Sequence, residues 1–203
     1  MSVFDWRRAG SWCGLAGASI FLVTWAAAIY ATPGYDFGGQ WVSDLGVSEG
    51  AAFFNSGAIL AGVLSIPFAF SLMLVLRPSR LGGLGCIVMI LAGIALAGVG
   101  IFTEDAGSAH TMVSLSFFSL MLLALVLLMW PLHKSYTLGP LAGDFTAAIV
   151  LMGVALFTLY GMSPLAETMA VLLIDIWSLA IAWKLRHYLC IIAPQIERRP
   201  LTF

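Results

Sequence analysis

The side chains with the most evident chemistry are two carboxylates and one imidazole in the polar segments between long apolar runs. Asp44 precedes the second apolar run, Glu104 follows the third, and His110 lies in the first turns of the fourth. Such a set could bind a divalent metal and activate water for hydrolysis. It could instead form a protonatable entrance to a binding cavity, or the acids could simply cap helices and solvate loops. The sequence leaves these three interpretations open.

Further polar residues lie close to these three in the sequence and are candidates for ligand contacts. They are Trp41, Ser43, Asn55, Asp105, Ser114 and Glu167. Ser114 follows His110 by about one helical turn and is therefore expected on the same helix face. Because loops on one side of a small bundle are close in space, we expect these groups to converge.

Asp175 lies near the middle of the last apolar run. An ionised carboxylate at the centre of a bilayer costs several kcal/mol, and no Lys or Arg occurs at a similar depth. We therefore expect Asp175 to be protonated, to bond a hydroxyl such as that of Ser65 or Ser114, or to face a polar cavity. Glu167 and Asp175 share one helix face, so together they could line a proton or cation path.

The composition defines the class of protein that carries these residues. Hydrophobic residues make up 61% of the 203 residues, charged residues 9%, and the mean hydropathy is +1.01. A soluble domain carries about 25% charged residues, so this chain lacks the polar groups to cover its own surface in water. A net charge of −1 argues against nucleic-acid binding, which needs a basic patch. The composition predicts an all-α integral membrane protein.

Six apolar runs are each long enough to cross about 30 Å of hydrocarbon. They cover residues 9–31, 51–76, 81–102, 108–130, 141–160 and 164–184. We expect one compact six-helix membrane domain, residues 1–203, without a soluble domain. The third run is rich in Gly and Ala, which allow close helix contact, and is expected to be central in the bundle.

The cations are distributed on one side of the expected membrane domain. All 9 Lys and Arg lie before the first run, between the second and third, between the fourth and fifth, or at and beyond the end of the sixth. The other three loops carry no cation, and the acids Asp36, Asp44, Glu49, Glu104, Asp105 and Glu167 lie in two of them and at the start of the sixth run. The positive-inside rule therefore predicts a multi-pass protein of the cell membrane with both termini in the cytoplasm and the acidic loops on the extracytoplasmic side.

Two short segments resemble domain-of-unknown-function family 998, a family of small six-span prokaryotic membrane proteins that is common in archaea. They are Ser-Asp-Leu-Gly at residues 43–46, followed by Phe-Asn at 54–55, and Gly-Ile-Phe-Thr-Glu at 100–104, followed by His110. The resemblance covers nearly the whole chain. It implies the six-span fold and a site on the outer side, without an established activity.

A more distant similarity is to membrane hydrolases that include alkaline ceramidases and adiponectin-type receptors. Those proteins combine Ser, Asp and three His around zinc in seven spans, and Ser43, Asp44 and His110 match part of that set. Only one histidine is expected on the outer side here, so a metal would have to rely on the carboxylates of Asp44 and Glu104.

Taken together, these residues favour an outer-side acidic and histidine-containing pocket that binds or processes a lipid or small apolar ligand. We expect its walls to come from the second, third, fourth and sixth helices, with membrane lipids as partners. No cofactor is predicted, although Asp44, Glu104 and His110 would suit a divalent metal. One alternative is a non-catalytic accessory subunit that packs against other membrane subunits or a second copy. Another is the proton or cation path along Glu167 and Asp175.

Overall fold

The computed structural model describes residues 5–77 and 79–189, and in these ranges it is all-helical. Within these ranges six helices are long and apolar enough to cross a membrane, which confirms the predicted number. They are α1 (Trp6–Tyr30), α2 (Ala51–Val75), α3 (Arg80–Ile101), α4 (Ser108–His133), α5 (Pro140–Tyr160) and α6 (Pro164–His187). Two short 3₁₀ helices, η1 (Val42–Val47) and η2 (Glu104–Ala106), lie in the connections.

The helix ends follow from local capping. The side chain of Asp5 accepts the N–H of Arg7, which lets α1 begin three residues before the expected start of the first span. Ser163 caps α6 by accepting the N–H of Ala166. The C-terminal end of α4 lies at His133, three residues beyond the predicted end, because the helix continues through Pro131. A proline removes one backbone hydrogen bond without ending the helix when the surrounding packing is retained.

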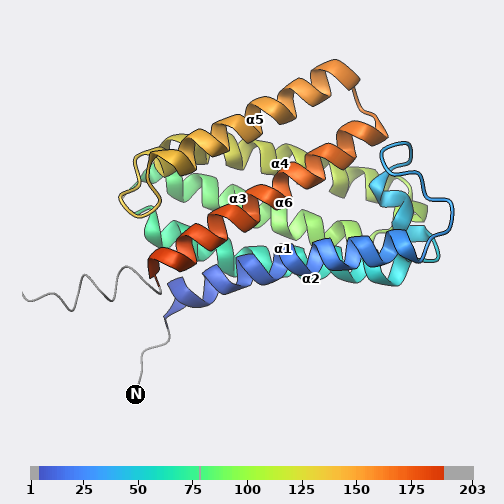
Figure 1. The fold of residues 1–203 in the computed structure, drawn as a ribbon, viewed down its shortest axis with the longest axis horizontal. Coiled ribbons are helices and arrows are strands. Elements are labelled where there is room, and N and C mark those ends of the chain that lie inside the picture. Colours follow the sequence, from blue (N-terminus) through green and yellow to red (C-terminus); the bar gives the residue numbers. More distant parts are fainter. Residues whose placement is uncertain (1–4, 78, 190–203) are drawn as a thin grey trace, which may run out of the picture.

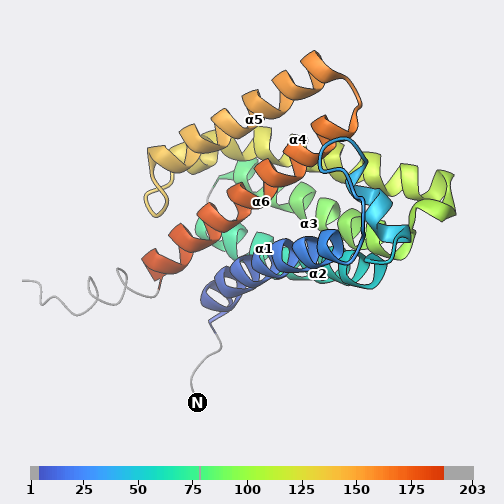
Figure 2. The ribbon, with the colours of Figure 1, turned by 45° about the vertical axis from the view of Figure 1, so that its right-hand side comes forward.

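The six helices form a closed ring in chain order. Each helix packs against the next one along the chain, and α6 packs against α1. Figures 1 and 2 show α5 at one edge of the molecule, where it packs against α4 and α6. The predicted compact bundle therefore has a defined interior, between α6 on one side and α1 to α4 on the other.

Close backbone contact holds α2 and α3 together. A Cβ atom built on Gly62 would lie 2.5 Å from the carbonyl oxygen of Gly93 and 2.6 Å from the backbone nitrogen of Ala97. Gly100 is equally close to α2, since its Cβ would lie 2.5 Å from the carbonyl oxygen of Asn55. In lipid, helices associate through such packing. The small residues of α3 are therefore used at its interface, and α3 packs on both α2 and α4.

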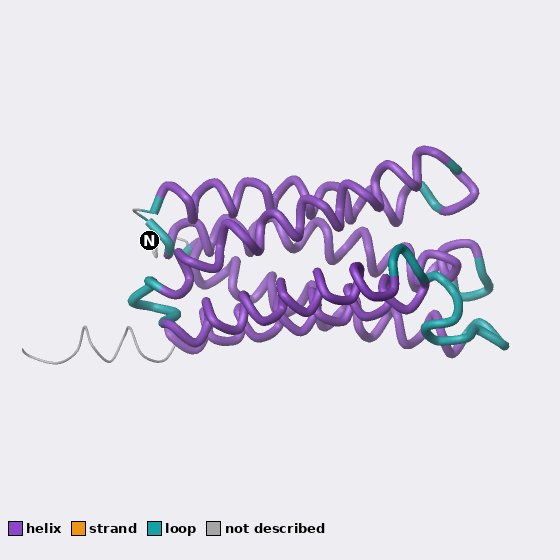
Figure 3. The backbone as a smooth tube through the Cα atoms, turned by 90° about the horizontal axis from the view of Figure 1, so that it is seen from above, coloured by secondary structure: helices purple, strands orange, loops and turns teal. Residues whose placement is uncertain are grey.

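The connections gather at the two ends of the bundle (Figure 3). At one end lie the start of α1, the loops 76–79 and 134–139, and the end of α6, and every Lys and Arg in the described ranges belongs to it. We call it the cationic end. At the other, acidic end lie the segments 31–50, 102–107 and 161–163, none of which carries Lys or Arg; the first two carry acids, and Glu167 lies in the first turn of α6 after the third.

The half of the bundle next to the cationic end is densely packed. Its core includes Phe68, Leu72, Leu128, Trp177 and Leu185, each at most 1% exposed. The indole of Trp177 donates a hydrogen bond to the Thr146 hydroxyl at 2.9 Å, so its polar atom is satisfied. We call this region the packed half.

Candidate functional site

The 3₁₀ helix η1 covers the acidic end of the bundle and is called the roof (residues 42–47). Val42 and Leu45 are 2% and 0% exposed and pack in a cluster with Phe21, Trp25 and Phe54 of α1 and α2. Apolar anchors of this kind fix a short segment that has few backbone bonds of its own. The roof is therefore a built part of the fold.

Two of the predicted site residues meet where the roof contacts η2. The carboxyl groups of Asp44 and Glu104 lie close enough to share a hydrogen bond. Asp44 also accepts the backbone N–H of Trp41 at 3.1 Å. Two carboxyl groups can share a hydrogen bond only if one of them carries a proton. Burial, followed by the hydrogen bond to Asp44 and the charge of Asp44, raises the pKa of Glu104 to about 7.

A third acid fixes the roof from below. Glu167, in the first turn of α6, accepts the N–H of Val42 at 2.7 Å. Beside it, Tyr35 donates to the carbonyl oxygen of Trp41 at 3.2 Å. Burial and the nearby charges of Glu167, Asp44 and Asp36 raise the pKa of Tyr35 to about 12. The phenol is therefore neutral, and the site around the roof is strongly acidic.

His110 has partners of a different kind. The side chain is 8% exposed, with Nδ1 2.7 Å from the carbonyl oxygen of Phe102 and Nε2 3.2 Å from the hydroxyl oxygen of Ser114. A carbonyl oxygen only accepts, so Nδ1 donates, and in the neutral imidazole Nε2 accepts from Ser114. The bond to Phe102 connects the end of α3 to α4, whereas the bond to Ser114 lies within α4. Among the described residues His110 forms no hydrogen bond with Asp44 or Glu104.

The three residues expected to bind a metal ion, Asp44, Glu104 and His110, do not all lie together. Within residues 5–77 and 79–189, no group of three or more His, Cys, Asp or Glu side chains is arranged to hold a metal ion. Asp44 and Glu104 meet, while both ring nitrogens of His110 are engaged elsewhere. A metal bound by these three residues remains a prediction, and it would require His110 to change partners.

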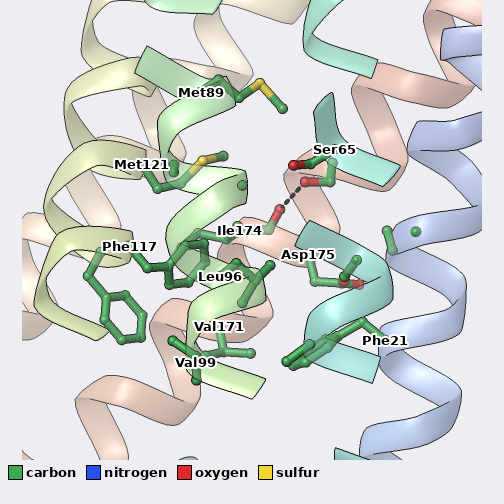
Figure 4. Close-up of a pocket in the computed structure, with 18 of the residues that line it drawn as sticks. Phe21, Ser65, Met89, Leu96, Val99, Phe117, Met121, Val171, Ile174 and Asp175 are labelled. Atoms are coloured by element: carbon green, nitrogen blue, oxygen red, sulfur yellow. Dashed lines mark hydrogen bonds between the residues drawn. The ribbon is translucent and has the colours of Figure 1, made fainter. Parts of the chain in front are cut away.

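A cavity of about 100 Å³ lies inside the helix ring beneath the roof (Figure 4). Its walls come from α1, α2, α3, α4, α6 and the roof, so the contribution of α1 adds to the four helices predicted. Most lining side chains are apolar, including Phe21, Leu96, Val99, Phe117 and Val171. The polar lining residues include Ser43, Ser65, Ser114, Glu167, Asp175 and Ser178.

Asp175 lines this cavity at mid-depth in α6 and is 6% exposed. Within the described chain, its buried Oδ2 atom has no hydrogen-bond partner. The hydroxyls of Ser65 and Ser178 donate instead to the carbonyl oxygens of Gly62 and Ile174, at 2.7 and 2.9 Å. Asp175 thus lines a cavity, as one of the expected arrangements has it, but most of the lining is apolar and not polar as expected.

The remaining candidate residues support the loops that surround the cavity. The side-chain amide of Asn55 donates to the carbonyl oxygen of Gly46 at 2.9 Å and so ties the roof to α2. Asp105 is exposed and accepts a hydrogen bond from the hydroxyl of Thr103. Trp41 immediately precedes the roof. None of these three is among the residues that line the described cavity.

The aromatic walls of the cavity were missed by the sequence reasoning. Phe21, Phe54 and Phe117 line the cavity, yet each occurs in a run that is apolar on all sides. A helix without a polar face gives no periodic signal for which side chains point inward. The small residues Gly14 and Gly17 of α1, which also line the cavity, were the available indication of an inward face.

The fold and this site define a small multi-pass helical membrane protein with an internal cavity covered by an acidic segment. The chain belongs to the family described as "Protein of unknown function (DUF998)", whose family model matches residues 15–184. The resemblance of the two sequence segments is thereby confirmed. No curated protein and no solved structure matches the chain.

Proposed function

We propose that this protein binds a lipid or another small apolar molecule in the cavity beneath the roof. The observation that carries the proposal is the cavity itself, which has mostly apolar walls and a few polar groups, Glu167 and Asp175 among them. Ligand sites in proteins commonly combine an apolar lining with a small number of placed polar groups.

The cavity is closed toward the cationic end, which supports binding over conduction. Its lining reaches Phe68 on α2 and Ser178 on α6. One turn further, Leu72 and Ile181 are 0% and 1% exposed within the packed half. A proton or cation path would need a continuous polar route, and the described core offers apolar side chains there. Glu167 and Asp175 therefore suit a binding site better than a channel.

The acidic end would be the entrance. Asp44 and Glu104 lie where the roof meets η2, with Trp41 beside them, and Ser43, Ser114 and Glu167 line the upper cavity. His110 would orient the hydroxyl of Ser114 toward or away from a ligand, because its Nε2 lies 3.2 Å from that hydroxyl oxygen. These are the polar contacts that a ligand would meet as it passes beneath the roof.

The orientation of the protein is part of the proposal. By the positive-inside rule the cationic end faces the cytoplasm, with both termini, and the acidic end faces outward from the cell membrane. A ligand would then enter from the extracytoplasmic side or the outer leaflet.

A cavity-filling substitution tests the binding proposal. Val171 lines the cavity, whereas Ile176 on the same helix is 49% exposed on the outer surface of the bundle. We expect Val171→Phe to displace bound lipid or apolar probe, while Ile176→Phe leaves binding unchanged. Native mass spectrometry of the gently solubilised proteins would measure the bound mass. Equal ligand loads in wild type and Val171→Phe would contradict the proposal.

The accessory-subunit alternative rests on the outward faces of the bundle. Leu141, Leu151 and Leu159 of α5 are 74%, 70% and 76% exposed. Lipid covers such side chains as readily as a protein partner does. Co-purification of a second protein that is insensitive to Val171→Phe would favour this alternative.

A further inference from the structure

We propose that the preferred ligand is a hydrophobic amine, whose ammonium group pairs with the carboxylate of Asp175 while its hydrocarbon part fills the apolar cavity. This inference rests on the proposed binding function and adds the chemical class of the ligand. Its starting observation is a buried carboxyl that faces the cavity with Oδ2 unpaired in the described structure. Burying a carboxyl without a hydrogen-bond partner costs free energy, and a bound hydrogen-bond donor or cation would reduce that cost.

The charges around the cavity decide against an anionic ligand. Asp36, Asp44, Glu104 and Glu167 lie at the acidic end, and the described residues of that end include no Lys or Arg. A fatty acid or phosphate group would be repelled there and would also leave Asp175 without a partner. A monocation is attracted by the acids at the entrance, and inside the cavity it meets the carboxyl groups of Glu167 and Asp175.

The walls of the cavity decide between a metal ion and an organic cation. A hard metal ion takes about six or more oxygen ligands or keeps bound water. Near Asp175 the lining is mainly apolar, and the hydroxyls of Ser65 and Ser178 already donate within their own helices. Phe21 and Phe54 add aromatic rings, whose faces attract ammonium groups. An amine with an apolar chain can pair its ammonium group with the Asp175 carboxylate and pack its chain against the apolar lining.

A neutral alcohol is the closest competitor, because its hydroxyl could donate to the Asp175 carboxyl without supplying a charge. Three probes with the same hydrocarbon chain separate these chemistries: n-decylamine, n-decanol and n-decanoate. Near neutral pH the amine is protonated, as lysine is. We expect decylamine to bind the wild-type protein at least about tenfold more tightly than either of the others.

Substitutions at Asp175 identify the anchor. Asp175→Asn keeps the size of the side chain and removes its charge, and we expect it to weaken decylamine binding by about tenfold or more with decanol binding little changed. Asp175→Glu keeps the charge and should restore decylamine binding. Asp144→Asn, an acid beside His133 at the cationic end, serves as the control and should bind as wild type does. Native mass spectrometry at fixed detergent concentration gives the bound fractions.

The outcomes separate this inference from the proposed function. If decylamine and decanol bind equally, or if Asp175→Asn binds decylamine as wild type does while Val171→Phe loses both probes, the amine inference is wrong and the cavity remains a binding site. If no probe binds, or if binding is insensitive to Val171→Phe, both proposals fail. A poorly folded Asp175→Asn would be recognised by its elution profile, and the comparison of the three probes on the wild-type protein would then decide.

Discussion

At the scale of single residues, the close contact between α2 and α3 depends on glycines, which have no side chain to keep the two backbones apart. The predicted Cβ position of Gly62 falls on backbone atoms of Gly93 and Ala97, which cannot rotate away as a flexible side chain could. A methyl group there must push the two helices apart, and overpacking of this kind typically costs about 1–3 kcal/mol.

We therefore expect Gly62→Ala to lower the free energy of unfolding by about 1–3 kcal/mol. The matched control is Gly83→Ala on α3, where a Cβ meets nothing within 4 Å. That change should be neutral or stabilising by up to about 1 kcal/mol, because Ala favours the helix. Reversible unfolding in mixed detergent micelles measures both. Equal stability of Gly62→Ala and the wild type would show that the helices separate without cost.

Single residues also show how far sequence reasoning reaches into the candidate site. Asp175 could be singled out because an acid amid apolar residues has a cost that elementary electrostatics supplies. The contact between Asp44 and Glu104 was expected from the shared end of the bundle, and the structure brings them together. His110 was expected beside them but bonds Phe102 and Ser114, because a nearby carbonyl satisfies Nδ1 first. Which carbonyl oxygen lies near His110 depends on the tertiary structure and cannot be read from the spacing of residues in the sequence.

At the scale of elements, the roof is held by groups with different dependence on pH. Val42 and Leu45 anchor it by apolar packing, while the bond between Asp44 and Glu104 requires a proton. The groups that face Glu104 are Asp44 on the roof and Glu167 on α6. Both are acids, so deprotonation of Glu104 replaces a hydrogen bond with repulsion.

The pKa of Glu104, about 7, lies above the ordinary value of a glutamate, so the closed state binds this proton more tightly than an open state does. At low pH the proton on Glu104 therefore stabilises the closed state, in which the roof contacts η2. This stabilisation is lost as the pH rises from the ordinary pKa of a glutamate through about 7. We expect the amides of residues 42–47 to be better protected from hydrogen exchange at about pH 5.5 than at about pH 8, after correction for intrinsic rates.

A variant assigns the effect to one side chain. Glu104→Gln supplies an amide donor to Asp44 at every pH, so the difference in protection should become smaller. Glu49→Gln, at an exposed acid of the same end, should keep the wild-type behaviour. An undiminished pH dependence in Glu104→Gln would assign the titration to another group, such as Glu167, which accepts the N–H of Val42.

Elements also mark the limit of prediction from the sequence. The six helices could be predicted because each run is long and apolar, and their observed ends differ from expectation by a few residues. The roof could not be predicted as a covering element. Its sequence reads as a polar loop, and Val42 and Leu45 become anchors only through contacts with Phe21 and Phe54 of two separate helices.

At the scale of the whole molecule, the separation of charge between the two ends is the feature with the widest consequence. If the cationic end is cytoplasmic, exposed positions at the two ends should differ in access from outside the cell. Glu49 at the acidic end is exposed, and Tyr136 at the cationic end is 91% exposed. In a protein whose three native cysteines are replaced, we expect a membrane-impermeant maleimide to label Glu49→Cys and to spare Tyr136→Cys until the membrane is permeabilised. Labelling of Tyr136→Cys in intact cells would reverse the proposed orientation, and the binding proposal would then have its entrance on the cytoplasmic side.

The ring of helices is also a succession of three hairpins. In α1 with α2, α3 with α4, and α5 with α6, the chain turns at the acidic end, and Lys or Arg lies at the cationic end where each hairpin begins or ends. If the acidic end faces outward, the three segments that must be carried across the bilayer during synthesis contain no basic residue. Each hairpin then carries its own charge signal for the same orientation.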